Sequence, residues 1–289
     1  MGKYVSRSGS AFRLFRCLQY DCIAGFRFTL IPLFAVAVLC FALFAGAYGH
    51  SKLFRIDVSG MLASDVLGLV LAGAPRFEWR PGLLARLPLG WLALMGFTLY
   101  ASLVYPTFDL RALGGRSLLA AGSRRIWLLS KMLWVCFVTA GAAGVMVATS
   151  LLVACILDMP FGYVVNDATL QLAMVSVDSI GRQAVCLAPF LIVAFTAITA
   201  LAELQLVIAL FVHPTVSFGA CLACLVGGYF VQSPLLLGNG LMLARWGGIV
   251  NSGVSTSEVM VVAVVLCAVC CVVGMCVTGR VDIYEKGEQ

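Results

Sequence analysis

Side chains that could act in catalysis are scarce in this chain of 289 residues. It has only two histidines, His50 and His213, and neither is accompanied by the nucleophile and acid of a catalytic triad. The sequence contains no HExxH motif, no paired membrane aspartates and no phosphate-binding glycine loop, so neither a metalloprotease nor an ATPase is indicated. We therefore expect a protein that is not itself an enzyme and has no catalytic residues.

Cysteine is the second residue type that could do chemistry. Cys221 and Cys224 form a CxxC pair, which with Cys267, Cys270 and Cys271 could in principle bind a metal ion. Most of the twelve cysteines, however, lie in long apolar stretches, where a free thiol behaves as a small hydrophobic group. We expect neither a metal site nor a bound cofactor.

One carboxylate, Glu203, lies in an otherwise apolar stretch. An acid at the centre of a bilayer costs about 2.5–3.5 kcal/mol, so such residues face a bundle interior or a cavity. Two interpretations are open. Glu203 could belong to a transport pathway with Thr199 and Gln205, or it could lie near the cytoplasmic end of its helix, partly hydrated or paired with a base.

The elements that position these residues are membrane helices. Hydrophobic residues make up 62% of the chain and charged residues only 11%, whereas a soluble domain has roughly 25% charged residues. A helix needs about 20 apolar residues to cross the hydrocarbon layer of a bilayer. Six such stretches occur, at about 28–48, 87–108, 132–157, 183–209, 215–236 and 259–279. We expect an all-α, polytopic integral membrane protein with six transmembrane helices, forming a single domain over residues 1–289.

The distribution of lysine and arginine orients the bundle, because these residues gather in short cytoplasmic loops. Residues 1–27 hold five of them against one acid, and residues 109–131 also hold five against one acid. Residues 158–182 instead hold three acids and one base. The loop 50–86 is an exception, since it carries five bases and three acids on the predicted outer side. On balance, we expect both termini to be cytoplasmic.

Two helix surfaces stand out by their spacing. Before the first span, apolar residues recur every three or four positions with basic and polar residues between them: Phe12, Phe15, Leu18, Cys22 and Phe26, with Arg13, Arg16 and Gln19. This pattern predicts an amphipathic helix in the headgroup region of an anionic inner leaflet, and the alternative is a solvated extension. In the third span, Ala140, Gly144 and Ala148 form a small-residue stripe that would pack within the chain or against a second copy.

The loop between the second and third spans is basic and partly apolar. Glycines break it at 114–115 and at Gly122, and Arg124, Arg125 and Trp127 then lead into the third span. A short basic helix across the cytoplasmic face would suit docking of a soluble partner. The alternative is that Arg124, Arg125 and Lys131 only set the topology, with Trp127 as an interfacial anchor.

The order of these features resembles the permease subunits of type-2 ABC exporters, the ABC2-membrane family of Gram-positive bacteria. The likeness is carried by Tyr20-Asp21, by Tyr105-Pro106 followed by Asp109-Leu110, and by residues 122–131, which open the third span. Residues 233–240, 242–245 and 279–283 are similar to the stretch before the last span and to the short tail of that family.

The resemblance implies a subunit of a bacterial plasma membrane that pairs with a second permease, identical or homologous. A separate ATP-binding subunit, carrying ATP and Mg, would dock on each cytoplasmic face; nucleic acid is not an expected partner. A coupling helix would lie between spans 2 and 3, with candidate ATPase contacts at Arg116, Ser123, Arg124, Arg125, Trp127 and Lys131. A lipid-like or amphipathic substrate could enter the path between the two permeases from the bilayer.

Two other functions are compatible with the sequence. A secondary transporter or channel would use Glu203 as its proton or ion ligand, although membrane-embedded charges are few and no inverted repeat is evident. A membrane accessory or immunity protein would bind a partner and transport nothing.

Overall fold

The computed structural model describes residues 10–56, 60–77, 87–110, 121–173 and 185–278. Its elements in chain order are α1 (Ser10–Phe54), α2 (Ala63–Val70), α3 (Leu89–Phe108), α5 (Arg124–Ile156), β1 (Val164–Val165), α6 (Asp167–Leu172), β2 (Val185–Cys186), α7 (Ala188–Ala209), α8 (Pro214–Phe230), η3 (Leu237–Leu241), η4 (Leu243–Arg245) and α9 (Thr256–Thr278). The two short strands pair antiparallel, with Val164 opposite Cys186. The chain is therefore a helical bundle with one minimal sheet.

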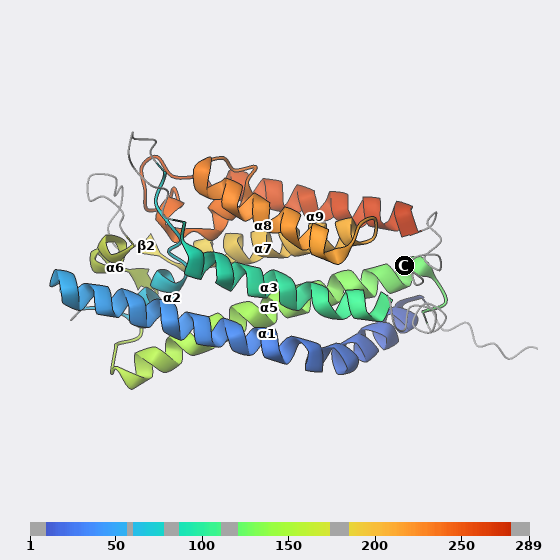
Figure 1. Cartoon of the computed structure of the whole chain (residues 1–289), viewed down its shortest axis with the longest axis horizontal. Helices are drawn as coiled ribbons and strands as arrows, with labels where there is room; N and C mark the ends of the chain where they lie inside the picture. Colours follow the sequence, from blue (N-terminus) through green and yellow to red (C-terminus); the bar gives the residue numbers. More distant parts are fainter. Residues whose placement is uncertain (1–9, 57–59, 78–86, 111–120, 174–184, 279–289) are drawn as a thin grey trace, which may run out of the picture.

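Among the residues that the structure describes, five helices are long and apolar enough to cross a membrane: α1, α3, α5, α7 and α9. They lie side by side along the molecule (Figure 1). This agrees with a multi-pass membrane protein. The fifth expected span is shorter than the predicted 215–236, because α8 has 17 residues and ends at Phe230. Beyond it the backbone is extended, and the Asn239 side chain holds this conformation by donating hydrogen bonds to the carbonyls of Val231 and Ser233.

The predicted interfacial helix before the first span is not a separate element. It is continuous with the span in α1, whose 45 residues correspond to a length of about 67 Å. Pro32 lies inside α1, which is bent toward its N-terminal end in Figure 1. Proline removes one helical hydrogen bond, but α1 continues through Pro32 without a break.

Helix α7 lies at the centre of the bundle and packs against α3, α5, α8 and α9, while α1 packs across α3 and α5. The buried residues of these helices form the main hydrophobic core. α1 and α9 are the least buried spans and expose large aliphatic and aromatic side chains along their outer faces. Such exposure is expected of helices that face lipid.

Short elements close one end of the bundle, shown on the left in Figure 1, and we call this group (α2, β1, β2, α6, η3 and η4) the cap. All eight residues of α2 are buried. Asp65 fixes α2 to the start of α6: its carboxylate accepts hydrogen bonds from the backbone N–H groups of Leu62 and Asn166 at 2.7 and 2.8 Å and from the Thr169 hydroxyl at 2.7 Å. The cap is therefore held by buried polar contacts as well as by apolar packing.

Arg245 is the second buried charge of the cap. Its guanidinium has five N–H donors, and all five bond to oxygens: the carbonyls of Ala74, Pro75, Gly228 and Tyr229, and the Asn239 side chain. Burial lowers the pKa of Arg245 to about 10, so the side chain stays protonated at neutral pH. One arginine thus ties the segment after α2 to the end of α8 and to η3.

Candidate functional site

A buried ion cluster lies at the other end of the bundle, where α3 ends and α5 begins. The Lys131 ammonium on α5 is 2.6 Å from the Asp21 carboxylate on α1 and 2.8 Å from the Asp109 carboxylate that follows α3. Each of these three side chains is at most 3% exposed. One cation is therefore shared between two acids that come from different helices.

Three neutral side chains complete this arrangement. The Tyr105 hydroxyl donates to Asp21 Oδ1 at 2.7 Å, and the Ser130 hydroxyl donates to Asp21 Oδ2 at 2.5 Å. The Trp127 indole donates to Asp109 Oδ2 at 3.2 Å. The Lys131 ammonium also lies 4.5 Å from the centre of the Tyr105 ring, a cation–π distance. We call Asp21, Tyr105, Asp109, Trp127, Ser130 and Lys131 the charged cluster.

Close contact between α1 and its neighbours allows Asp21 to reach the charged cluster. Gly25 lies one turn after Asp21 on the same face of α1. A Cβ at Gly25 would be 2.5 Å from Trp134 Cζ2 and 2.9 Å from Tyr105 Cδ1. Only glycine fits at this crossing, because any other residue would push α1 away from α5.

Replacing Gly25 with alanine is therefore expected to lower the free energy of unfolding by about 1–3 kcal/mol, the usual cost of overpacking. Gly46→Ala on the same helix is the matched control, since a Cβ there meets nothing within 4 Å. The control should be neutral or slightly stabilising, because alanine favours helix over glycine. Unfolding by SDS in mixed micelles measures both variants. Equal stability of Gly25→Ala and Gly46→Ala would show that the crossing is not tight.

The charged cluster is suited to a mechanical role. Two desolvated carboxylates bound to one ammonium are costly to separate, and breaking such a buried arrangement typically costs about 3–5 kcal/mol. Lys131 lies two turns inside α5, which begins at Arg124 directly after the basic loop. A displacement of the start of α5 would therefore be passed to α1 and α3 through Asp21 and Asp109.

The structure separates the residues predicted to contact an ATPase into two groups. Arg125 is exposed, Arg124 and Ser123 are half-buried, and Ser123 precedes the first turn of α5. Trp127 and Lys131 are 2% and 1% exposed. In this conformation their side chains are therefore not accessible to a soluble partner. Arg116 lies outside the described residues, as do the other residues of 111–120 in the loop that was expected to hold the coupling helix.

Sequence reasoning did not assign a role to Asp21 or Asp109. In the sequence, both are single acids in basic segments and belong to the short motifs Tyr20-Asp21 and Asp109-Leu110. A usable signal was present, since each is the one acid of a strongly basic stretch next to a span. An isolated acid among bases at a helix end is a candidate for burial with one of those bases.

Glu203 on α7 is also buried, 7% exposed. Its Oε1 accepts a weak hydrogen bond from the Cys136 thiol on α5 at 3.6 Å, and one turn away the Thr199 and Thr139 hydroxyls are 2.9 Å apart. In the described part of the chain no base pairs with Glu203, which does not fit the interpretation of a hydrated or base-paired acid. Gln205 is fully buried, and its amide has no hydrogen-bond partner among the described residues.

The small-residue stripe lies on the outside of the bundle. Ala140, Gly144 and Ala148 are all exposed on α5, and a Cβ at Gly144 would meet nothing within 4 Å. The described residues of this chain therefore do not pack on the stripe. Packing of the stripe against a second copy stays a prediction.

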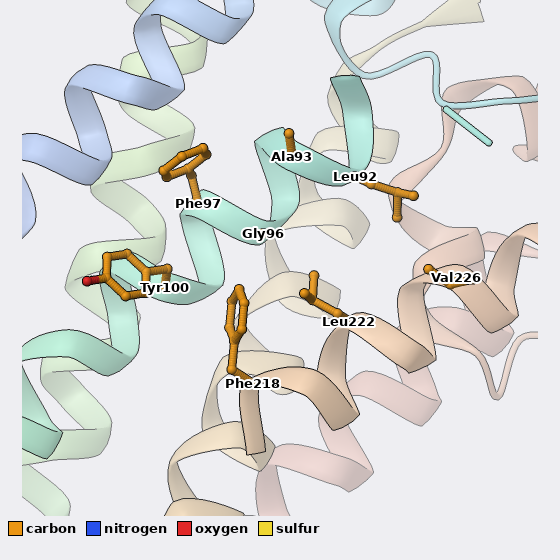
Figure 2. A pocket seen from close by; sticks show the side chains of 8 residues that line it. All are labelled: Leu92, Ala93, Gly96, Phe97, Tyr100, Phe218, Leu222 and Val226. Carbon is orange, nitrogen blue, oxygen red and sulfur yellow. The ribbon is translucent and has the colours of Figure 1, made fainter. Parts of the chain in front are cut away.

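An open apolar groove of about 480 Å³ separates α3 from α8 (Figure 2). Its walls are Leu92, Ala93, Gly96, Phe97 and Tyr100 from α3, and Phe218, Leu222 and Val226 from α8. The Tyr100 and Phe218 rings meet edge to face at 6.3 Å. The volume is in the range of small-molecule sites, and the walls suit only an apolar group.

No family model, no curated protein sequence and no solved structure matches this chain.

Proposed function

We propose that this chain is the transmembrane permease subunit of an ATP-driven exporter in a bacterial plasma membrane. The observation that carries the proposal is the charged cluster. It connects α5 to α1 and α3 in the bundle interior, next to the basic loop that precedes α5. A permease without its own ATPase needs such a connection, because a soluble motor can act only on the surface. The resemblance to type-2 ABC exporter permeases supports the same function.

In this proposal the exposed start of α5 receives the ATPase and the buried cluster transmits the movement. Arg125 offers a charge to the partner, while Lys131 joins the helices that must move together. ATP drives the change only through the different affinities of the ATPase pair for the two permease conformations. The α3–α8 groove would hold the apolar part of a substrate, and a second permease would complete the pathway.

The test is purification of the tagged chain from its native membranes in a gentle detergent, with mass spectrometry of the proteins that remain bound. A soluble ATPase is expected in stoichiometric amount. Arg124→Glu combined with Arg125→Glu should lower its recovery by about tenfold or more, since reversing two contact charges costs several kcal/mol. Arg55→Glu is the control, because Arg55 is exposed at the opposite end of α1.

Recovery of the chain alone, in several detergents and in nanodiscs, would contradict the proposal. So would an ATPase that binds the double variant as well as it binds the wild type.

A secondary transporter or channel is the second candidate, and the burial of Glu203 beside the Thr139–Thr199 contact favours it. The two functions differ in their energy source. The second candidate requires transport that follows an ion gradient without any ATPase and that stops in Glu203→Gln. The proposed exporter requires ATP, and its transport should tolerate Glu203→Gln.

A further inference from the structure

The first two-fifths of α1, residues 10–27, has two opposite faces. Successive helical residues are about 100° apart, so one outward face collects Phe12, Phe15, Arg16, Gln19, Ile23, Phe26 and Arg27. All seven side chains are exposed. Asp21 lies on the opposite face and is buried in the charged cluster. We call the exposed set the outer face of α1.

The apolar part of the outer face continues without a break along the span. Leu30 and Phe34 extend the stripe formed by Phe15, Ile23 and Phe26, and Phe15 and Ile23 are 64% and 73% exposed. Side chains of this kind at bilayer depth are solvated by acyl chains. The stripe therefore leads from the hydrocarbon layer into the headgroup region.

The outer face of α1 is positively charged, and its arginines form no ion pair with a described carboxylate. Arg16 and Arg27 are both exposed, and the Arg16 guanidinium lies 4.7 Å from the centre of the Phe12 ring. No carboxylate among the described residues pairs with either arginine. Asp21, the one acid in residues 10–27, is bound by Lys131, Tyr105 and Ser130 on the other side of the helix.

We propose that the outer face of α1 binds anionic phospholipids of the surrounding leaflet. Guanidinium groups recognise phosphate, and arginines flanked by aromatic and aliphatic side chains match a negative headgroup above an acyl chain. Arg16 and Arg27 are about 16 Å apart along the helix, so each binds its own headgroup. The deeper Arg27 reaches the interface by extending its flexible side chain. This inference does not depend on the exporter function.

The bound lipid and the charged cluster would then contact the same part of α1 from opposite sides. Anionic lipid binds residues 10–27 of α1 in the folded protein and holds them against the bundle. Bound lipid should therefore raise the free energy of unfolding by mass action. Gly122, two residues before α5, adjoins this part of α1, since Arg13 Nη1 would be 3.1 Å from a Cβ at Gly122. The composition of the leaflet is thereby linked to the position of the start of α5.

The test is native mass spectrometry of the full-length protein titrated with phosphatidylglycerol or with phosphatidylcholine of the same acyl chains. The wild type should retain phosphatidylglycerol preferentially. Arg16→Gln combined with Arg27→Gln should weaken its binding by about fivefold for each arginine, the factor that a basic residue contributes near an anionic surface. Phosphatidylcholine binding should not change. Arg16→Lys with Arg27→Lys keeps the charges and should keep the preference.

Equal binding of the two lipids by the wild type would overturn the proposal, as would full phosphatidylglycerol preference in the glutamine variant. The wild type also allows a test without substitution, because added salt screens exposed charges. A preference that does not fall with ionic strength would overturn the proposal too. Protein dimers that depend on Arg16 and Arg27, without lipid preference, would assign the outer face to a second copy instead.

Discussion

Replacing Lys131 with methionine will lower the free energy of unfolding by about 3–5 kcal/mol. The substitution removes the one ammonium between Asp21 and Asp109, which lie 2.6 and 2.8 Å from it. The Asp21 and Asp109 carboxylates are then left without their counter-ion, and water cannot replace it well because both side chains are buried. Unfolding by SDS in mixed micelles, followed by the fluorescence of the adjacent tryptophans, measures the loss.

A triple variant separates charge from packing in this experiment. Asp21→Asn and Asp109→Asn, added to Lys131→Met, remove the uncompensated charges and should recover much of the stability, because a neutral replacement of a buried ion cluster is often tolerated. Lys52→Met is the matched control, since Lys52 is exposed near the other end of α1. Wild-type stability of the single variant would show that Lys131 does not hold the three helices together.

Replacing Arg245 with methionine will destabilise the cap by about 3 kcal/mol or more. The variant leaves five acceptor oxygens without their donor, four of them in buried hydrogen bonds. Each unsatisfied buried group costs about 1–3 kcal/mol, part of which water can recover. Arg245→Lys should lose less but should not match the wild type, because an ammonium has only three donors. Hydrogen exchange of the backbone in residues 71–77 and 237–246 measures the opening directly.

Arg55→Met serves as the control for this experiment, because Arg55 is exposed. Exchange of residues 71–77 should rise in Arg245→Met and stay unchanged in the control. If Arg245→Lys exchanged as slowly as the wild type, the charge alone would hold the cap, and the five directed hydrogen bonds would not be needed.

The sequence was most informative about the spans. The second and the last expected spans illustrate this. The pattern predicts residues 87–108 and α3 covers Leu89–Phe108, and it predicts 259–279 and α9 covers Thr256–Thr278. A run of apolar residues of bilayer length can be stable only as a membrane helix, since lipid offers no partner for backbone N–H and C=O groups. The helical, multi-pass character follows from this constraint alone.

Helix ends next to water were predicted less well. Hydropathy falls at Arg27, yet α1 continues back to Ser10, because an amphipathic segment and an apolar span can share one helix when no residue stops it. The reverse holds for α8, which ends at Phe230 although the apolar run continues. There Asn239, eight residues after Val231 in the sequence, competes for the backbone carbonyls.

The composition and order of residues thus determined that this protein is a bundle of membrane helices with few charges inside it. The tertiary structure decided which charges meet. Asp21 and Lys131 are 110 positions apart, and they pair only because Gly25 lets α1 cross close to Trp134. Arg245 donates a hydrogen bond to the Ala74 carbonyl, 171 positions away, because tertiary packing brings the two segments together. Hydrophobicity is a local property that the chain carries at each position, whereas the partner of a buried charge depends on how helices cross, and that is fixed only when all of them pack.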